Sequence, residues 1–159
     1  MVLTANGSSR GSGGLPIYAP NTVRPSQAAV VNIKQAETQQ LDIVLPDKAT
    51  LHRIEGHVEV EGVGPLENAL VRLYPTAEGG LTATSSPLSA QKSFSFSDVP
   101  DGDYTVEVEF PPTSTLVSVD SANGLIHMRM SPPDYAAASQ DIHVAGRDVT
   151  DILLAPTHR

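Results

Sequence analysis

Histidine side chains are the groups in this sequence that would most readily bind a metal ion or transfer a proton near neutral pH. His52 and His57 are five residues apart on one predicted strand, so their side chains point to opposite faces and cannot share a metal ion. His127 and His143 fall on two different predicted strands and meet only if those strands pair. We therefore predict that the histidines form no metal site.

Three carboxylates, those of Asp98, Asp101 and Asp103, crowd one predicted turn, where their oxygens could serve as calcium ligands. Their spacing lacks the pattern of an EF-hand loop, and Asp is common in turns because its side chain bonds the nearby backbone. A structural role in the turn is therefore the favoured interpretation, and a calcium site is the alternative.

Motifs for catalysis are missing from the sequence. It contains no G-x-S-x-G nucleophile elbow, no H-E-x-x-H and no glycine-rich phosphate loop, and its serines alternate with apolar residues as on solvated strand faces. It contains no cysteine, which excludes thiolate catalysis, sulfur-ligated zinc and disulfides. We predict a protein that is not an enzyme, with no catalytic residues and no cofactor.

Aromatic side chains could stack on sugar rings, as they do in many carbohydrate-binding modules. Trp is absent and aromatic residues make up only 4% of the chain, which disfavours that function. Tyr104 is predicted to lie in the core, whereas Tyr18, Tyr74 and Tyr135 are expected to be exposed. Tyr74 and Tyr135 are therefore the candidate ligand contacts.

The charge balance argues against polyanionic partners. Ten Lys and Arg residues stand against 18 Asp and Glu residues, a formal charge of −8, and the basic residues are scattered along the chain. No basic stripe is available to neutralise phosphates. Nucleic acid is therefore excluded as a partner, and an anionic membrane surface is disfavoured.

Strands with one buried face are the elements that must position these residues, because apolar side chains recur at every second position. The predicted inward-facing residues are Ile54, Gly56, Val58, Val60, Ala69, Val71, Leu73, Phe94, Phe96, Tyr104, Val106, Val108 and Phe110. Weaker alternating segments lie at residues 117–119, 126–130, 142–144 and 152–154. Seven or eight short strands predict an all-β, antiparallel Greek-key sandwich, because a single open sheet would leave an apolar face in water.

The order along the chain predicts three parts. Residues 1–14 are rich in Gly and Ser and are expected to form a flexible tail, residues 15–50 a strand-bearing remnant of a preceding module, and residues 51–156 the sandwich. The segment before the sandwich resembles the end of the chain at a separation of about 110 residues, which is a domain-sized period. This repetition predicts a piece of a protein built from tandem modules.

Three motifs follow one another in the predicted sandwich: I-x-G-x-V at 54–58, A-x-V-x-L at 69–73, and S-F-x-F-x-x-V-x-x-G-x-Y at 93–104. In this the chain resembles the carboxypeptidase regulatory-like domain, a transthyretin-like β-sandwich that is also similar to immunoglobulin-like folds. The resemblance implies a non-enzymatic module of bacterial, especially acidobacterial, exported proteins, and hence a secreted or cell-envelope location.

The residue type at three positions of these motifs also has a physical reason. Gly56 within a strand indicates a bulge or the close approach of another backbone, and Gly102 suits a turn that needs positive φ. Tyr104 is expected to bury its ring and to bond its hydroxyl to nearby main chain, as in a tyrosine corner. All three residues are predicted to be structural.

The predicted function is a structural or interaction module, serving as a spacer or in adhesion, and the alternative is a carbohydrate-binding module with a starch-binding-like sandwich. The expected partners are neighbouring modules of the same protein, another protein or a glycan. Residues 15–50 carry apolar side chains without a partner sheet, so we expect them to dock on the sandwich or on a second copy, as a homodimer contact.

Overall fold

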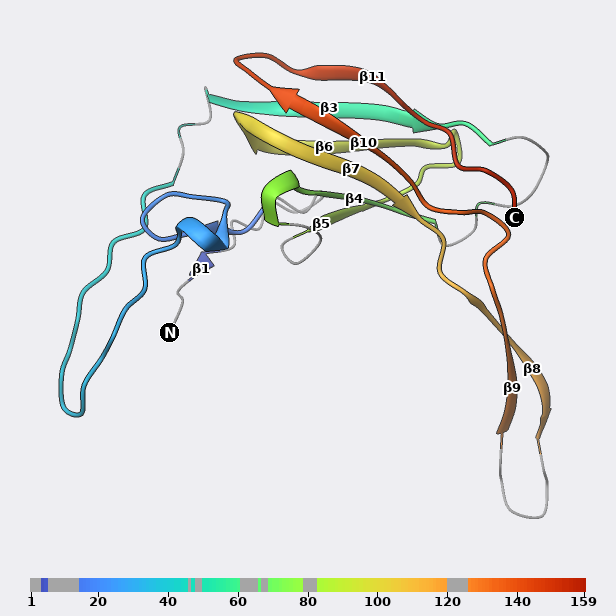
Figure 1. The fold of residues 1–159 in the computed structure, drawn as a ribbon, viewed down its shortest axis with the longest axis horizontal. Coiled ribbons are helices and arrows are strands. Elements are labelled where there is room, and N and C mark those ends of the chain that lie inside the picture. Colours follow the sequence, from blue (N-terminus) through green and yellow to red (C-terminus); the bar gives the residue numbers. More distant parts are fainter. Residues whose placement is uncertain are drawn as a thin grey trace.

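Two facing β-sheets form the centre of the computed structural model (Figure 1). The structure describes residues 4–5, 15–45, 47, 50–60, 66, 69–78, 83–119 and 126–159. Its elements are β1 Thr4–Ala5, β2 Ile17–Tyr18, the 3-10 helix η1 Pro25–Gln27, β3 Leu51–Val58, β4 Leu70–Pro75, β5 Thr84–Pro87, β6 Ser93–Pro100, β7 Gly102–Glu109, β8 Thr113–Val119, β9 Ile126–Ser131, β10 Ala138–Val144 and β11 Val149–Leu154. The predicted all-β sandwich is confirmed. No helix among the described residues is long and apolar enough to cross a membrane.

The sandwich has one sheet of four strands in the order β10-β7-β4-β5 and one of three strands in the order β11-β3-β6. Every neighbouring pair in these sheets is antiparallel except β11 and β3, which run parallel. The expectation of a wholly antiparallel sandwich is therefore wrong for this pair. After β10, an edge strand of the four-stranded sheet, the chain turns at Gly146, where φ is 65°. It then enters the three-stranded sheet as β11, beside β3.

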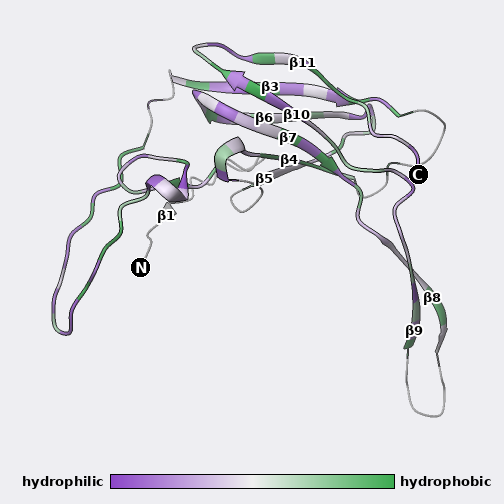
Figure 2. Ribbon diagram, in the orientation of Figure 1, coloured by the Kyte–Doolittle hydropathy of each residue, from purple (hydrophilic) through white to green (hydrophobic). Residues whose placement is uncertain are grey.

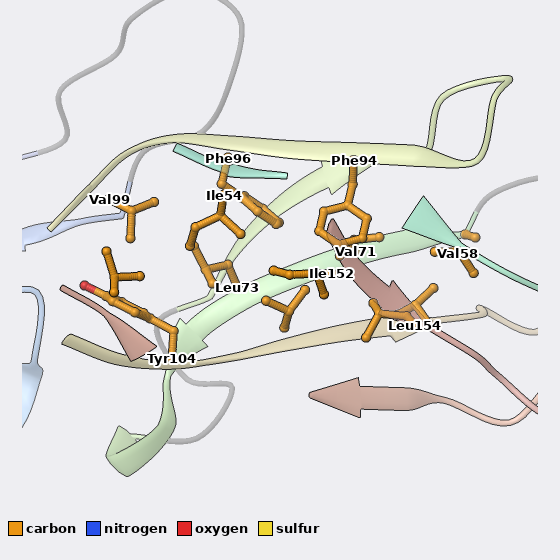
Figure 3. Packing of buried hydrophobic residues seen from close by; sticks show 14 of the residues in the cluster. Ile54, Val58, Val71, Leu73, Phe94, Phe96, Val99, Tyr104, Ile152 and Leu154 are labelled. Atoms are coloured by element: carbon orange, nitrogen blue, oxygen red, sulfur yellow. The ribbon is translucent and has the colours of Figure 1, made fainter. Parts of the chain in front are cut away.

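The core lies between the two sheets and contains the residues that the alternation predicts (Figure 3). Ile54, Val71 and Val106 have no exposed surface, and Phe96 is 1% exposed. Phe110 is only partly buried, at the margin of the same cluster. Alternate residues of β3, β4, β6 and β7 therefore point into one dry interior, whose burial is the main stabilising contribution to such a fold.

Strands β8 and β9 form a separate two-stranded ribbon that extends away from the sandwich (Figure 1). Both were expected to be sandwich strands, and this expectation is wrong, because within the described residues they pair with each other and with no strand of the sandwich. Pro111 and Pro112 precede β8, and Pro132 and Pro133 follow β9. Proline lacks the N–H that a sheet ladder needs, so neither β7 nor β10 continues into the ribbon.

Residues before the sandwich contact it without adding a strand to it. Leu15 is 6% exposed and belongs to the same buried cluster as the sandwich, and Val31 is 9% exposed. Between residues 28 and 45 the structure has no strand, although alternating apolar residues indicated one. Thr4 and Ala5 pair with β2, and the rest of the expected tail at 1–14 lies outside the described residues. The division into modules stays a prediction.

Candidate functional site

The outer face of the four-stranded sheet carries most of the polar side chains that could meet a ligand. On this face the Arg72 guanidinium lies 2.8 Å from a carboxylate oxygen of Glu109, on the neighbouring strand β7. The Tyr74 hydroxyl donates a hydrogen bond to Glu107 at 3.2 Å. Burial and the Glu107 charge raise the pKa of Tyr74 above its ordinary value. These cross-strand pairs stabilise the sheet and leave the charged groups partnered.

The polar pairing continues at one end of the same face. Thr105 is 7% exposed, and its hydroxyl lies 2.7 Å from Asp141 and 3.1 Å from the Thr76 hydroxyl. His143 Nδ1 lies 2.7 Å from a carboxylate oxygen of Asp103. Of these residues, Thr76, Asp103, Asp141 and His143 border an open cavity of about 530 Å³, which is also lined by Arg24, Ala77 and Ile142. A polar ligand that entered it would have to compete with hydrogen bonds that the protein already makes.

Tyr135 is buried, at 5% exposure, so the expectation that it is exposed is wrong. Its ring lies between two others, with centroids 5.3 Å from Phe110 and 5.3 Å from His158, the latter edge-on. It contributes to a shallow groove of about 400 Å³ where the ribbon joins the sandwich. Tyr74 does not line this groove, so the groove does not bring the two candidate ligand contacts together.

The carboxylates of the predicted Asp turn each have a different partner, and that of Asp98 accepts a hydrogen bond from the Ser97 hydroxyl at 3.4 Å. Asp101 accepts a hydrogen bond from the Gly146 N–H at 2.8 Å and lies 3.0 Å from His52 Nε2. Asp103 pairs with His143, as described above. Asp148, which sequence reasoning missed, accepts a hydrogen bond from the Arg53 N–H at 2.8 Å. The hydrogen bond between Gly146 and Asp101 joins the turn to the connection between β10 and β11. This favours the structural interpretation of the turn.

Nothing in the described part of the chain groups three or more His, Asp or Glu side chains in a way that could hold a metal ion. His127 lies on β9, which pairs only with β8, and His143 lies on β10, which pairs with β7. The two histidines are therefore not brought together.

Gly56 lies in β3, and Gly102 and Tyr104 lie at the start of β7. A Cβ atom on Gly56 would lie 2.5 Å from the Ile152 carbonyl oxygen, so this position allows β11 to approach β3. Gly102 has φ of 154°, which side-chain-bearing residues rarely adopt. The Tyr104 hydroxyl donates to the Pro100 carbonyl oxygen at 3.0 Å, and burial raises the pKa of Tyr104 to about 12.

One face of the β8–β9 ribbon exposes large apolar side chains, a feature that sequence reasoning missed. Figure 2 colours the residues of these two strands by their hydropathy. Leu116 pairs with Met128, and a register shift after Leu116 marks a bulge in β8. The residues that we call the apolar ribbon face are Leu116, Ile126, Met128 and Met130, with exposed fractions of 57, 63, 57 and 63%. Val117, at the bulge in β8, is 58% exposed. The signal available in the sequence was the pair of prolines on each side of an alternating apolar segment.

The opposite ribbon face is polar. There Thr115 pairs with Arg129 and Ser118 pairs with His127. The strands β8 and β9 contain no Asp or Glu, so the ribbon is poor in the negative charge that dominates the chain. The ribbon is therefore two-faced like a sandwich strand, but no sheet covers its apolar side among the described residues.

Comparisons with protein-family models and with curated proteins find no match. Among solved structures, a candidate carbohydrate-binding protein from Pseudomonas aeruginosa is similar with a TM-score of 0.43 and 13% identity, over 69% of this chain and 90% of that one. A DUF3823 family protein from Parabacteroides merdae has a TM-score of 0.41 and 18% identity, over 69% of this chain and 47% of that one. A pilus-presented adhesin has a TM-score of 0.34 and 13% identity, over 74% of this chain and 31% of that one. At these values the likeness assigns neither a family nor a ligand to this chain.

Proposed function

We propose that this chain is a non-catalytic interaction module, in which the sandwich is the rigid support and the apolar ribbon face is the contact surface. The observation that carries the proposal is the exposure of four large apolar side chains on one face of a projecting ribbon. Contiguous apolar surface of this kind is typical of sites that meet another macromolecule. A two-stranded ribbon is also marginal in water by itself, so a partner that covers it would stabilise it.

The proposal includes membership of the carboxypeptidase regulatory-like type and a place in an exported or cell-envelope protein of several modules. The three motifs that carry this resemblance fall on β3, on β4 with the residue before it, and on β6 through β7. There Gly56 allows the close approach of β11 to β3, and the Tyr104 hydroxyl donates a hydrogen bond to the Pro100 carbonyl oxygen. A structural role for the motifs agrees with a module whose function is to hold other parts in place.

Cross-linking from the two ribbon faces tests the proposal. The photoreactive amino acid p-benzoylphenylalanine would be placed at Leu116 or, as the matched control, at Thr115 on the polar face. Irradiation of the purified protein, and of an extract of the cells that produce it, should give cross-linked products from position 116 and few from position 115. Equal yields from both faces, or none from either, would contradict the use of the apolar ribbon face as a contact surface.

Carbohydrate binding is the second candidate, and one observation favours it. The half-buried Tyr74 lies on the outer sheet face, and its neighbours Thr76 and Asp141 border the open polar cavity. Titration with a panel of glycans tests this function. Binding that Tyr74→Ala abolishes and Tyr74→Phe preserves would support it, whereas Tyr135→Ala should lower stability by loss of ring packing without being specific for the sugar.

A further inference from the structure

We propose that the partner of the apolar ribbon face is the same face of a second copy of this chain, in a twofold, face-to-face stack of two ribbons. This inference rests on the proposed function, and it names the occupant of that contact surface. It differs from a homodimer through residues 15–50, because it uses strands β8 and β9. Stacking two sheet faces about 10 Å apart is the ordinary way in which β-sheets bury apolar sides.

The size of the apolar ribbon face fits this partner. Four side chains, each 57 to 63% exposed, present apolar surface to solvent, and together they amount to roughly 450 Å² per copy. A twofold contact would bury about 900 Å² in total, which is the size of a weak, transient interface. Met128 and Met130 add adaptability, because unbranched side chains repack readily against an identical surface.

The distribution of charge also fits a second copy. Arg129 and His127 pair with Thr115 and Ser118 on the polar face, so a face-to-face stack leaves both in solvent and buries no charge against its like. An interface with a different protein could use opposite charges for recognition, so it would not require a face without charged groups. The apolar ribbon face is therefore self-complementary in its chemistry.

The projecting ribbon answers the objection that two chains of formal charge −8 repel each other. The seven residues of β8 extend over about 20 Å. If the two ribbons run in opposite directions, the sandwiches lie at opposite ends of the stack, separated by more than the Debye length of about 8 Å at physiological ionic strength. Repulsion between the acidic bodies is then largely screened, and apolar burial decides the association.

Sedimentation equilibrium of the purified protein tests the inference, over concentrations from about 5 to about 500 µM. The wild type should shift from monomer to dimer within this range. Leu116→Lys and Met128→Lys should each weaken association at least about tenfold, since each places a charge in the stack. The matched polar-face variants, Thr115→Lys and His127→Lys, should associate like the wild type. None of the four should change the unfolding temperature of the sandwich, because these residues lie outside its buried cluster.

Raising the salt concentration from about 50 to about 500 mM should leave the dimer intact or strengthen it, because screening removes only repulsion. Three results would overturn the inference: a monomer at every concentration, a dimer that Leu116→Lys does not weaken, or a monomer that sediments with phosphatidylcholine vesicles. Dimers lost in Ile33→Lys but kept in Leu116→Lys would place the interface in residues 15–50 instead. A monomer whose position 116 still cross-links to another protein would end this inference and leave the proposed function standing.

Discussion

Replacing Gly56 with Ala is the sharpest test of how β11 packs beside β3 in the three-stranded sheet. Gly56 lies in β3, the central strand of the three-stranded sheet, opposite Ile152 of β11. A Cβ atom there would lie 2.5 Å from the Ile152 carbonyl oxygen, 2.8 Å from the Ile152 Cβ and 2.5 Å from Phe94 Cζ. Carbon atoms in proteins approach to about 3.5 Å, so a single methyl group overlaps the backbone of one neighbour and the ring of another.

The expected cost follows from these distances. The Phe94 ring can rotate away, but the Ile152 carbonyl belongs to the β11 backbone and moves only with the strand. Overpacking of a dry core costs about 1–3 kcal/mol, and Ala recovers about 0.5–1 kcal/mol because it loses less entropy than Gly on folding. We therefore expect Gly56→Ala to lower the free energy of unfolding by about 1–2 kcal/mol, or the unfolding temperature by about 2–8 °C.

Urea unfolding followed by circular dichroism would measure the change, with Gly146 as the control position. A Cβ on Gly146 has nothing within 4 Å, but its φ of 65° is unfavourable for other residues. Replacement there should cost about 1–2 kcal/mol whatever the side chain, whereas Gly56→Leu should cost far more than Gly56→Ala. A Phe94→Leu background should relieve only part of the Gly56→Ala cost. A Gly56→Ala protein as stable as the wild type, or no dependence on side-chain size, would refute the close approach of β11.

Two further predictions concern the core and its pH dependence. Val106→Asp and Phe96→Ser should each lower the free energy of unfolding by about 4 kcal/mol or more and unfold much of the protein at 25 °C, because the wild-type side chains are 0 and 1% exposed. Glu107→Gln should change the free energy of unfolding by less than about 0.5 kcal/mol in the same urea titration. Burial raises the pKa of Tyr104 in the folded protein to about 12, above a value of about 10 in the unfolded chain; the neutral phenol is therefore favoured by folding, and its contribution of about 2–3 kcal/mol is present below pH 10 and lost between pH 10 and 12. Tyr104→Phe should flatten this alkaline decline in pH-dependent unfolding, and an unchanged decline would count against the buried phenol as its source.

The sequence was sufficient to predict the two-faced strands, because inward and outward alternation is a local property of each segment. Val58, Phe96 and Val106 are buried for this reason, with exposed fractions of 2, 1 and 0%. Alternation says which face of a strand is dry, but not which strand lies beside it. The parallel pairing of β11 with β3 therefore had no local signal.

Three other features escaped prediction for related reasons. Strand β5, Thr84–Pro87, has the sequence Thr-Ser-Ser-Pro, so no apolar period marks it as an edge strand. Strands β8 and β9 have that period, but among the described residues no second sheet covers it. Tyr135 was expected to be exposed, and its burial depends on Phe110 and His158 from distant parts of the chain. Candidate contacts such as Tyr74 could be named from residue type, while their pairing required the fold.

The parallel pairing of β3 and β11 has a consequence for how the protein is made. The Arg53 N–H donates a hydrogen bond to Asp148, which lies 95 residues later in the chain. During synthesis β3 therefore emerges from the ribosome long before β11 does. Until then one side of β3 offers free backbone groups to any extended segment, including the corresponding strand of another nascent molecule. Assembly of this sheet is expected to be slow, because contacts between distant segments pay loop-closure entropy first. Exchange of the last strand between molecules is therefore the characteristic misfolding error to look for when synthesis is rapid.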